Sequence, residues 1–134
     1  MQKEIDARGK IVIPGLVDLR AHLREPGQKH KGDIASETRA AAAGGITTLC
    51  CSPDTRPVVD SAAVVELIRR RSDEAGQAHV VPVAALTAGL AGEQLSEMWG
   101  LKQAGCIAVS NAQQPMSNTL VLRRRDHLGG LKGG

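Results

Sequence analysis

Short apolar segments alternate with helical segments that end in glycine along most of the chain, and this alternation limits the folds open to it. Four strands are predicted, at Leu16–Leu19, Ile46–Cys51, Val80–Ala85 and Cys106–Val109. Their starts recur about every thirty residues, which is the size of a βα unit. Strands that are apolar throughout are typical of a parallel sheet covered by helices.

Four helices are predicted from the segments that separate and follow these strands. They run over Ile34–Ala43, from Asp60 or Ser61 to Glu74, over Glu93–Ala104, and from Ser117 to Arg125. Side chains of the Asp and Ser type cap helix N-termini, and glycine ends helices because it adopts the left-handed conformation without cost. The sequence therefore predicts four successive βα units.

Two α/β architectures contain such units: an open doubly wound sheet, and the first half of a (β/α)8 TIM-type barrel. No strand is followed by G-x-G-x-x-G, so a dinucleotide-binding sheet loses its best support. Half a barrel leaves two unpaired parallel edges and an uncovered interior. Together with the Gly-rich end of the sequence, this favours a fragment of a larger fold.

Composition excludes several classes of function. The chain has no Phe, no Tyr and one Trp, and its formal charge is only +3. Without aromatic residues to stack on bases, nucleic acid is not a predicted partner. No apolar run is long enough for a membrane span, so no membrane partner is predicted. The three cysteines form no C-x-x-C pair and are interpreted as buried thiols in a reducing cytosol, which predicts a cytoplasmic protein.

Polar side chains follow each predicted strand. Arg20 and His22 lie at the end of the first, residues 52–55 follow the second, Thr87 follows the third and residues 110–113 follow the fourth. In both architectures the carboxyl ends of the strands carry the functional residues. These positions are therefore the candidate site.

The motifs P-G-L-V-D and H-L-R-E-P-G, followed by P-x-T-x-P and A-L-T-x-G-L, resemble dihydroorotase of the amidohydrolase superfamily. The resemblance covers nearly the whole chain but only the first third of a full-length member. It implies a partial (β/α)8 barrel of the metallo-dependent hydrolase fold over residues 16–126. Residues 1–15 would then remain from a strand of an N-terminal β-sandwich domain, and residues 127–134 would form an unstructured Gly-rich tail.

The same resemblance implies a chemistry, the reversible closure of N-carbamoyl-aspartate to dihydroorotate in pyrimidine biosynthesis. Its zinc centre activates a water molecule and is held in part by His-x-His on the first strand and a carboxylate after the fourth. The first of these histidines is Arg20 here, the second is His22, and the carboxylate position is Asn111. Arginine has no lone pair for a metal, and a neutral amide balances no charge.

Two further positions concern the family's substrate. Arg24 matches the arginine that binds the substrate carboxylate, a task that suits a planar guanidinium. Asp54 stands where the family has a substrate-binding asparagine, so it brings negative charge to an anion site. We expect Arg20 to fill the vacated metal space and to pair with Asp18 or Asp54. A carboxylate-bearing small molecule remains a possible ligand of Arg24.

Three hypotheses follow. The first is a non-catalytic dihydroorotase-like protein without a cofactor, which forms a hetero-oligomer with aspartate carbamoyltransferase, as the resemblance to degenerate bacterial homologues implies. The second is an active zinc-dependent cyclic amidohydrolase. The third is a truncated gene fragment without independent function. The changes at Arg20, Asp54 and Asn111 favour the first hypothesis.

Overall fold

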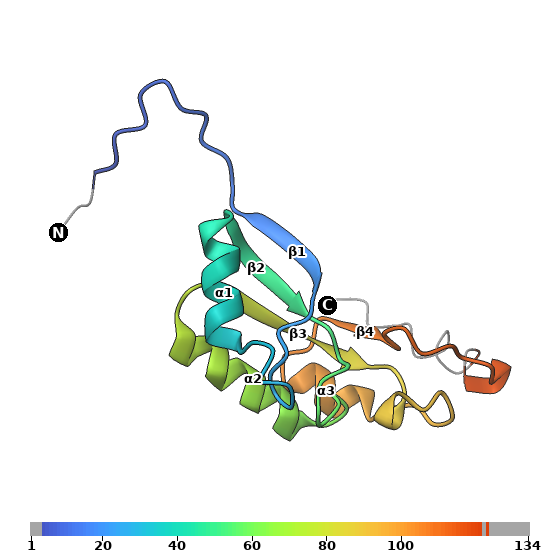
Figure 1. Cartoon of the computed structure of the whole chain (residues 1–134). Helices are drawn as coiled ribbons and strands as arrows, with labels where there is room; N and C mark the ends of the chain where they lie inside the picture. The colour runs from blue at the N-terminus through green and yellow to red at the C-terminus, as the bar shows by residue number, and fades with distance from the viewer. Residues whose placement is uncertain (1–3, 122, 124–134) are drawn as a thin grey trace.

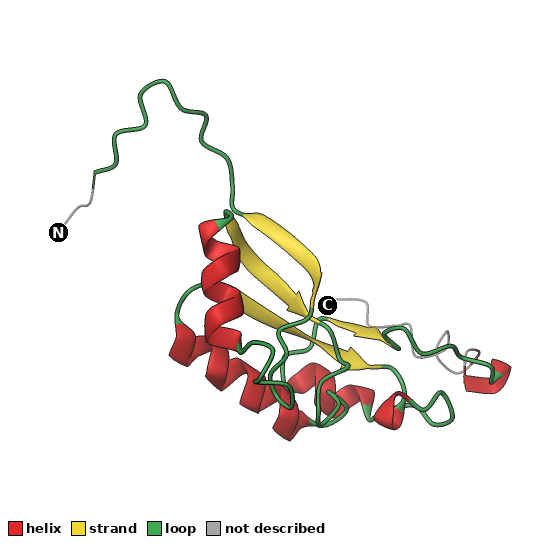
Figure 2. Ribbon diagram, viewed as in Figure 1, coloured by secondary structure: helices red, strands yellow, loops and turns green. Residues whose placement is uncertain are grey.

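The computed structural model describes residues 4–121 and 123, and it contains one parallel sheet with helices on one side (Figures 1 and 2). The strands are β1 (Leu16–Ala21), β2 (Ile46–Cys51), β3 (His79–Ala85) and β4 (Ala108–Ser110). Each pairs in parallel with the next, so the order across the sheet is β1-β2-β3-β4. The four predicted strands are thereby confirmed: β2 has the predicted ends, and the ends of the other three differ by at most two residues.

The helices that connect the strands are α1 (Ile34–Ala43), α2 (Ala62–Ala75), the short 3-10 helix η1 (Ala88–Leu90) and α3 (Met98–Gln103). The first begins as the sequence predicts, with a capping box in which the Asp33 carboxylate accepts a hydrogen bond from the Ser36 backbone N–H. The second ends at Gly76, which has a φ of 60°. Local sequence signals therefore determine the start of α1 and the end of α2.

The predicted helix over Glu93–Ala104 is wrong in its first half, because α3 begins only at Met98. The preceding segment returns to the end of β3 instead. Its backbone accepts a hydrogen bond from Ala88 N at Gln94 O, and Ser96 N donates one to Leu86 O. These bonds to a distant segment use the groups that a longer helix would need.

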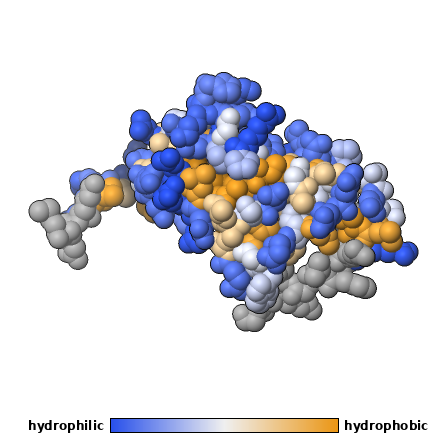
Figure 3. Space-filling view, turned by 90° about the horizontal axis from the view of Figure 1, so that it is seen from below, coloured by the Kyte–Doolittle hydropathy of each residue, from blue (hydrophilic) through white to orange (hydrophobic). Residues whose placement is uncertain are grey.

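The core lies between the sheet and the helices. Ile34 of α1 and Val65 and Ile68 of α2 are fully buried there against aliphatic residues of β2 and β3. Aliphatic side chains pack closely enough for this two-layer arrangement without any Phe or Tyr. Some apolar surface remains uncovered, and Figure 3 shows it as a central area surrounded by polar side chains.

The described residues before β1 lie outside this core. Residues 4–15 lead away from the sheet (Figure 1) and form no strand within the described part of the chain. Their assignment to a β-sandwich domain stays a prediction. Residues 119–121 and 123 have helical backbone, whereas the remainder of the predicted helix to Arg125 and the predicted Gly-rich tail over 127–134 lie outside the described residues.

Candidate functional site

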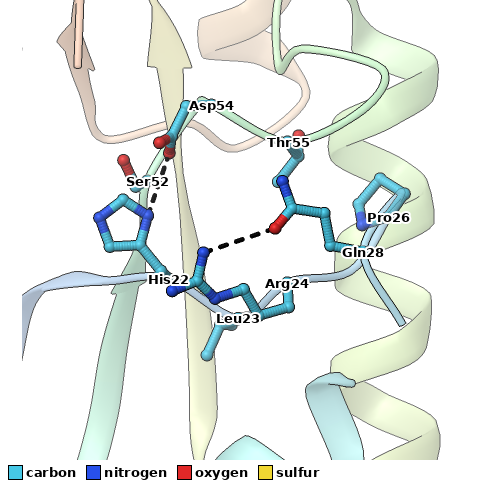
Figure 4. A pocket seen from close by; sticks show the side chains of 8 residues that line it. All are labelled: His22, Leu23, Arg24, Pro26, Gln28, Ser52, Asp54 and Thr55. Carbon is cyan, nitrogen blue, oxygen red and sulfur yellow. Dashed lines mark hydrogen bonds and ion pairs between the residues drawn. The ribbon is translucent and has the colours of Figure 1, made fainter. Parts of the chain in front are cut away.

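The loops after β1 and β2 form a small pocket at the carboxyl end of the sheet (Figure 4). It is lined by His22, Leu23, Arg24, Pro26, Gln28, Ser52, Asp54 and Thr55. Because parallel neighbours end at the same edge, the loop after each strand lies next to the other. Three of the candidate site residues, His22, Arg24 and Asp54, are therefore brought together as the sequence predicts.

His22 and Asp54 form an ion pair across this pocket. The imidazole Nδ1 lies 3.3 Å from the Asp54 carboxylate, and each side chain is about one-third exposed. A carboxylate at Nδ1 fixes the orientation of the ring. Asp54 thus contacts the retained histidine, a partnership that sequence reasoning missed because it depends on how two loops fold.

Arg24 is held by its own loop. Its backbone has a φ of 63°, which is uncommon for a residue with a side chain, and its guanidinium donates a hydrogen bond of 3.5 Å to the Gln28 side-chain oxygen. Figure 4 shows the guanidinium between His22 and Gln28. One long hydrogen bond to a neutral amide leaves most of the donors of this exposed guanidinium for a ligand.

The expected ion pair of Arg20 is wrong. Neither Asp18 nor Asp54 pairs with its guanidinium in the described part of the chain. The Asp18 carboxylate instead accepts a hydrogen bond of 2.8 Å from the Arg20 backbone N–H, and Arg20 remains exposed. The Asp18 carboxylate already accepts a backbone hydrogen bond, and the Asp54 carboxylate already contacts His22. Both expected partners of Arg20 therefore interact with other groups.

Asn111, at the end of β4, uses both ends of its amide. Its oxygen accepts a hydrogen bond of 2.6 Å from the Thr87 hydroxyl, and its nitrogen donates one of 3.1 Å to the Gln114 carbonyl. The Thr87 oxygen in turn accepts from Gly92 N–H, so the hydroxyl proton points to Asn111. This network joins the loops after β3 and β4. Thr87 is fully buried and was placed at this edge by the sequence, but its partner was not foreseen.

We expect Asn111→Asp, which introduces the family carboxylate, to lower the free energy of unfolding by about 1–2 kcal/mol at neutral pH. A carboxylate keeps the bond from Thr87 but places a second acceptor against the Gln114 carbonyl. Asn118→Asp is the matched control, because the Asn118 side chain accepts from Leu120 N–H through its oxygen. Urea denaturation followed by circular dichroism measures both. Equal losses in the two variants would contradict the proposed need for an amide at position 111.

The described strand ends bring few candidate metal ligands together. Within the described ranges, no three His, Cys, Asp or Glu side chains form a group that could hold a metal. Arg20 offers no lone pair, and the Asn111 amide is committed to Thr87 and Gln114. Among the positions matched to the family's metal ligands, His22 keeps a side chain that can donate to a metal.

Comparison with known proteins identifies the family. Residues 9–120 match the family described as dihydro-orotase-like. The chain belongs to this dihydro-orotase-like family. A dihydroorotase-like protein of Pseudomonas aeruginosa is 54% identical over 123 residues, which is 92% of this chain and 29% of the relative. A dihydroorotase of Pelobacter propionicus is 51% identical over 90% of this chain and 28% of its own length.

The chain therefore spans less than a third of the length of these dihydro-orotase-like relatives. Among solved structures, the L-hydantoinase (dihydropyrimidinase) of Arthrobacter aurescens matches with a TM-score of 0.65 and 26% identity. The match covers 78% of this chain and 23% of the hydantoinase. This match confirms a partial (β/α)8 barrel and rejects the alternative of a doubly wound sheet. No helix in the described residues is long and apolar enough to cross a membrane.

Proposed function

We propose that this chain is a non-catalytic dihydroorotase-like protein of pyrimidine biosynthesis and acts as a structural partner of aspartate carbamoyltransferase. The proposal rests on the residues that stand at two of the family's metal-ligand positions at the strand ends. Asn111 is bonded at both ends of its amide, and Arg20 occupies the first ligand position with no lone pair. A fold whose described loops are ordered by such bonds, with Arg20 and Asn111 at two of the family's ligand positions, is suited to a structural role.

The site also supports a residual binding function at Arg24. The guanidinium lines the pocket together with His22 and Asp54, and it donates one side-chain hydrogen bond, to Gln28. A carboxylate-bearing small molecule would complete the bidentate geometry that guanidinium favours. Asp54 weakens this attraction by its own negative charge, so we propose a weak ligand site rather than a substrate site.

The partnership is tested by expressing the tagged chain in its native host and recovering what it binds. We expect aspartate carbamoyltransferase to co-purify, and native mass spectrometry to show a complex of both chains. Recovery of the chain alone, under conditions in which it is folded by circular dichroism, would contradict the proposed partnership. Ile11→Lys is a suitable control, because this side chain is 92% exposed in the segment that leads away from the sheet.

The second candidate function is an active zinc-dependent cyclic amidohydrolase that interconverts N-carbamoyl-aspartate and dihydroorotate. The retained His22 and Arg24, together with relatives named dihydroorotase, favour it. It requires zinc in the purified protein and turnover of dihydroorotate, both of which are directly measurable. Under the non-catalytic proposal, elemental analysis after dialysis finds no bound zinc, and added zinc produces no turnover.

A further inference from the structure

The pocket between the loops after β1 and β2 contains two opposite charges that are not paired with each other. Arg24 and Asp54 both line it (Figure 4), yet no ion pair joins them within the described part of the chain. The Arg24 guanidinium donates its side-chain hydrogen bond to the neutral Gln28 amide instead. One small pocket therefore presents a cation and an anion to the same ligand.

The Asp54 carboxylate has one oxygen that a ligand can use. Its Oδ1 lies 3.3 Å from His22 Nδ1, whereas its Oδ2 accepts no hydrogen bond from any residue that the structure describes. The side chain is 37% exposed, so a ligand reaches it without displacing protein atoms. A carboxylate oxygen accepts its strongest hydrogen bonds from charged donors such as an ammonium group. Asp54 therefore favours a cationic group on the ligand.

Contacts between neighbouring strands and loops fix the relative position of these two charges. Ala21 is paired with Cys51 at the strand ends from which the loops start. Ser52 N–H donates a hydrogen bond of 2.9 Å to the Ala21 carbonyl. Farther along the loops, Arg56 N–H donates one of 3.0 Å to the Pro26 carbonyl. The pocket is thus built by two adjacent βα units of this chain.

We propose that this pocket binds a free amino acid, a small molecule that carries both a carboxylate and a protonated amine. The ligand carboxylate accepts hydrogen bonds from the Arg24 guanidinium, and the ligand ammonium donates to Asp54. The negative charge of Asp54 opposes a simple carboxylate, but it attracts a ligand that also has a positive charge. This inference rests on the proposed ligand site at Arg24 and adds Asp54 as the residue that sets its specificity.

The test is an NMR titration of the ¹⁵N-labelled 134-residue chain with probes that share one carbon skeleton. L-alanine and β-alanine carry an ammonium group on the first and the second carbon after the carboxylate, and propionate carries none. We expect at least one amino acid to shift the backbone N–H signals of the loops after β1 and β2. Its Kd should lie roughly tenfold below that of propionate, the effect of one charge-assisted hydrogen bond.

Substitutions at the two charged positions separate their contributions. Asp54→Asn introduces the family's asparagine and should remove the difference between the amino acids and propionate. Asp54→Ser also removes the charge and repeats the test if the first variant is unstable by circular dichroism. Arg24→Gln should raise the Kd of all three probes by roughly tenfold, because each uses the guanidinium. Asp73→Asn, at an exposed position of α2 outside the pocket, is the matched control and should bind like the native chain.

The outcomes distinguish this inference from the proposed function. A preference for an amino acid that is lost without the Asp54 charge supports the inference. Equal affinity for propionate and both amino acids overturns it but leaves the carboxylate site at Arg24 in place. No response to any probe overturns both, and the partnership with aspartate carbamoyltransferase is then still decided by co-purification. A preference that persists in the Asp54 variants also overturns the inference, because the ammonium group would bind elsewhere.

Discussion

Glu25→Ala is expected to lower the free energy of unfolding by about 2–3 kcal/mol, because it removes a buried carboxylate that three groups share. Glu25 is 5% exposed in the loop after β1. One of its oxygens accepts a hydrogen bond of 3.1 Å from Ile34 N–H, at the start of α1. The other lies 2.7 Å from the Lys29 ammonium and 3.5 Å from Nε of Arg71, on α2.

Two features keep the expected loss below that of a fully buried ion pair. Lys29 and Arg71 retain 59% and 40% of their side-chain exposure, so water partly replaces the lost carboxylate. The Arg71 Nε is within ion-pair range of Glu25 but makes no hydrogen bond to it. The Ile34 N–H, in contrast, is left buried and without its acceptor, which contributes most of the loss.

Urea denaturation of three variants separates these contributions. Glu25→Gln keeps an acceptor for Ile34 N–H but removes the charge, so we expect about half the loss seen with alanine. Glu66→Ala, at an exposed position of α2, should change stability by less than about 0.5 kcal/mol. If Glu25→Ala behaved like Glu66→Ala, the carboxylate would not hold the loop to α1 and α2.

The Glu25 carboxylate also helps to order the loop that carries the candidate site residue Arg24. Glu25 directly follows Arg24, whose left-handed backbone must be maintained by the surrounding loop. The loop is held from the other side as well, since Arg56 N–H donates a hydrogen bond to the Pro26 carbonyl. The L-R-E-P-G motif therefore has a structural task, the ordering of the loops after β1 and β2.

The elements that the sequence predicted correctly are those set by neighbouring residues. The strand Ile46–Cys51 and the helix Ile34–Ala43 have the predicted ends, because an apolar β-branched run and a capping Asp33 act within a few residues. For the N-terminus of α2 the sequence predicts two candidate caps, Asp60 and Ser61. Ser61 is its cap position, while the Asp60 carboxylate accepts a bond from Gly89 N–H, a contact between distant segments that no local pattern contains.

The candidate site was predicted in its positions but not in its contacts. The rule that strand ends carry function placed His22, Asp54 and Asn111 at one edge of the sheet, and the structure agrees. Which of them would touch was decided by loop conformation. Asp54 pairs with His22 instead of Arg20, and Asn111 pairs with Thr87. Spacing along a strand predicts a shared face, but it does not predict partners from another loop.

Cys51→Ala is expected to flatten the fall in stability above about pH 9, and this is the second large effect. Cys51 ends β2 and is fully buried. Burial, and the nearby negative charge of Asp54, raise the pKa of its thiol from 9.0 to about 12. In the unfolded chain the thiol ionises near its ordinary pKa, whereas in the folded chain it remains neutral.

The direction of the effect follows from proton binding. Above pH 9 the unfolded state loses the Cys51 proton and the folded state keeps it, so raising the pH favours unfolding. The stabilisation is complete below pH 9 and is lost progressively up to about pH 12. The limiting slope is about 1.4 kcal/mol per pH unit, which gives a loss of about 2 kcal/mol by about pH 10.5. Cys106, whose pKa burial raises to about 11, adds a contribution common to the native chain and the variant.

Denaturation curves from about pH 8 to pH 10.5 measure this difference. Cys51→Ala should begin with lower stability, because a small cavity replaces the thiol, but should lose about 2 kcal/mol less than the native chain over the range. Val80→Ala removes buried volume from the adjacent β3 without removing a titrating group, so its curve should run parallel to that of the native chain. If the Cys51→Ala curve were also parallel, the thiol would ionise equally in both states, and the Cys51 side chain could not be buried beside Asp54 as the structure has it.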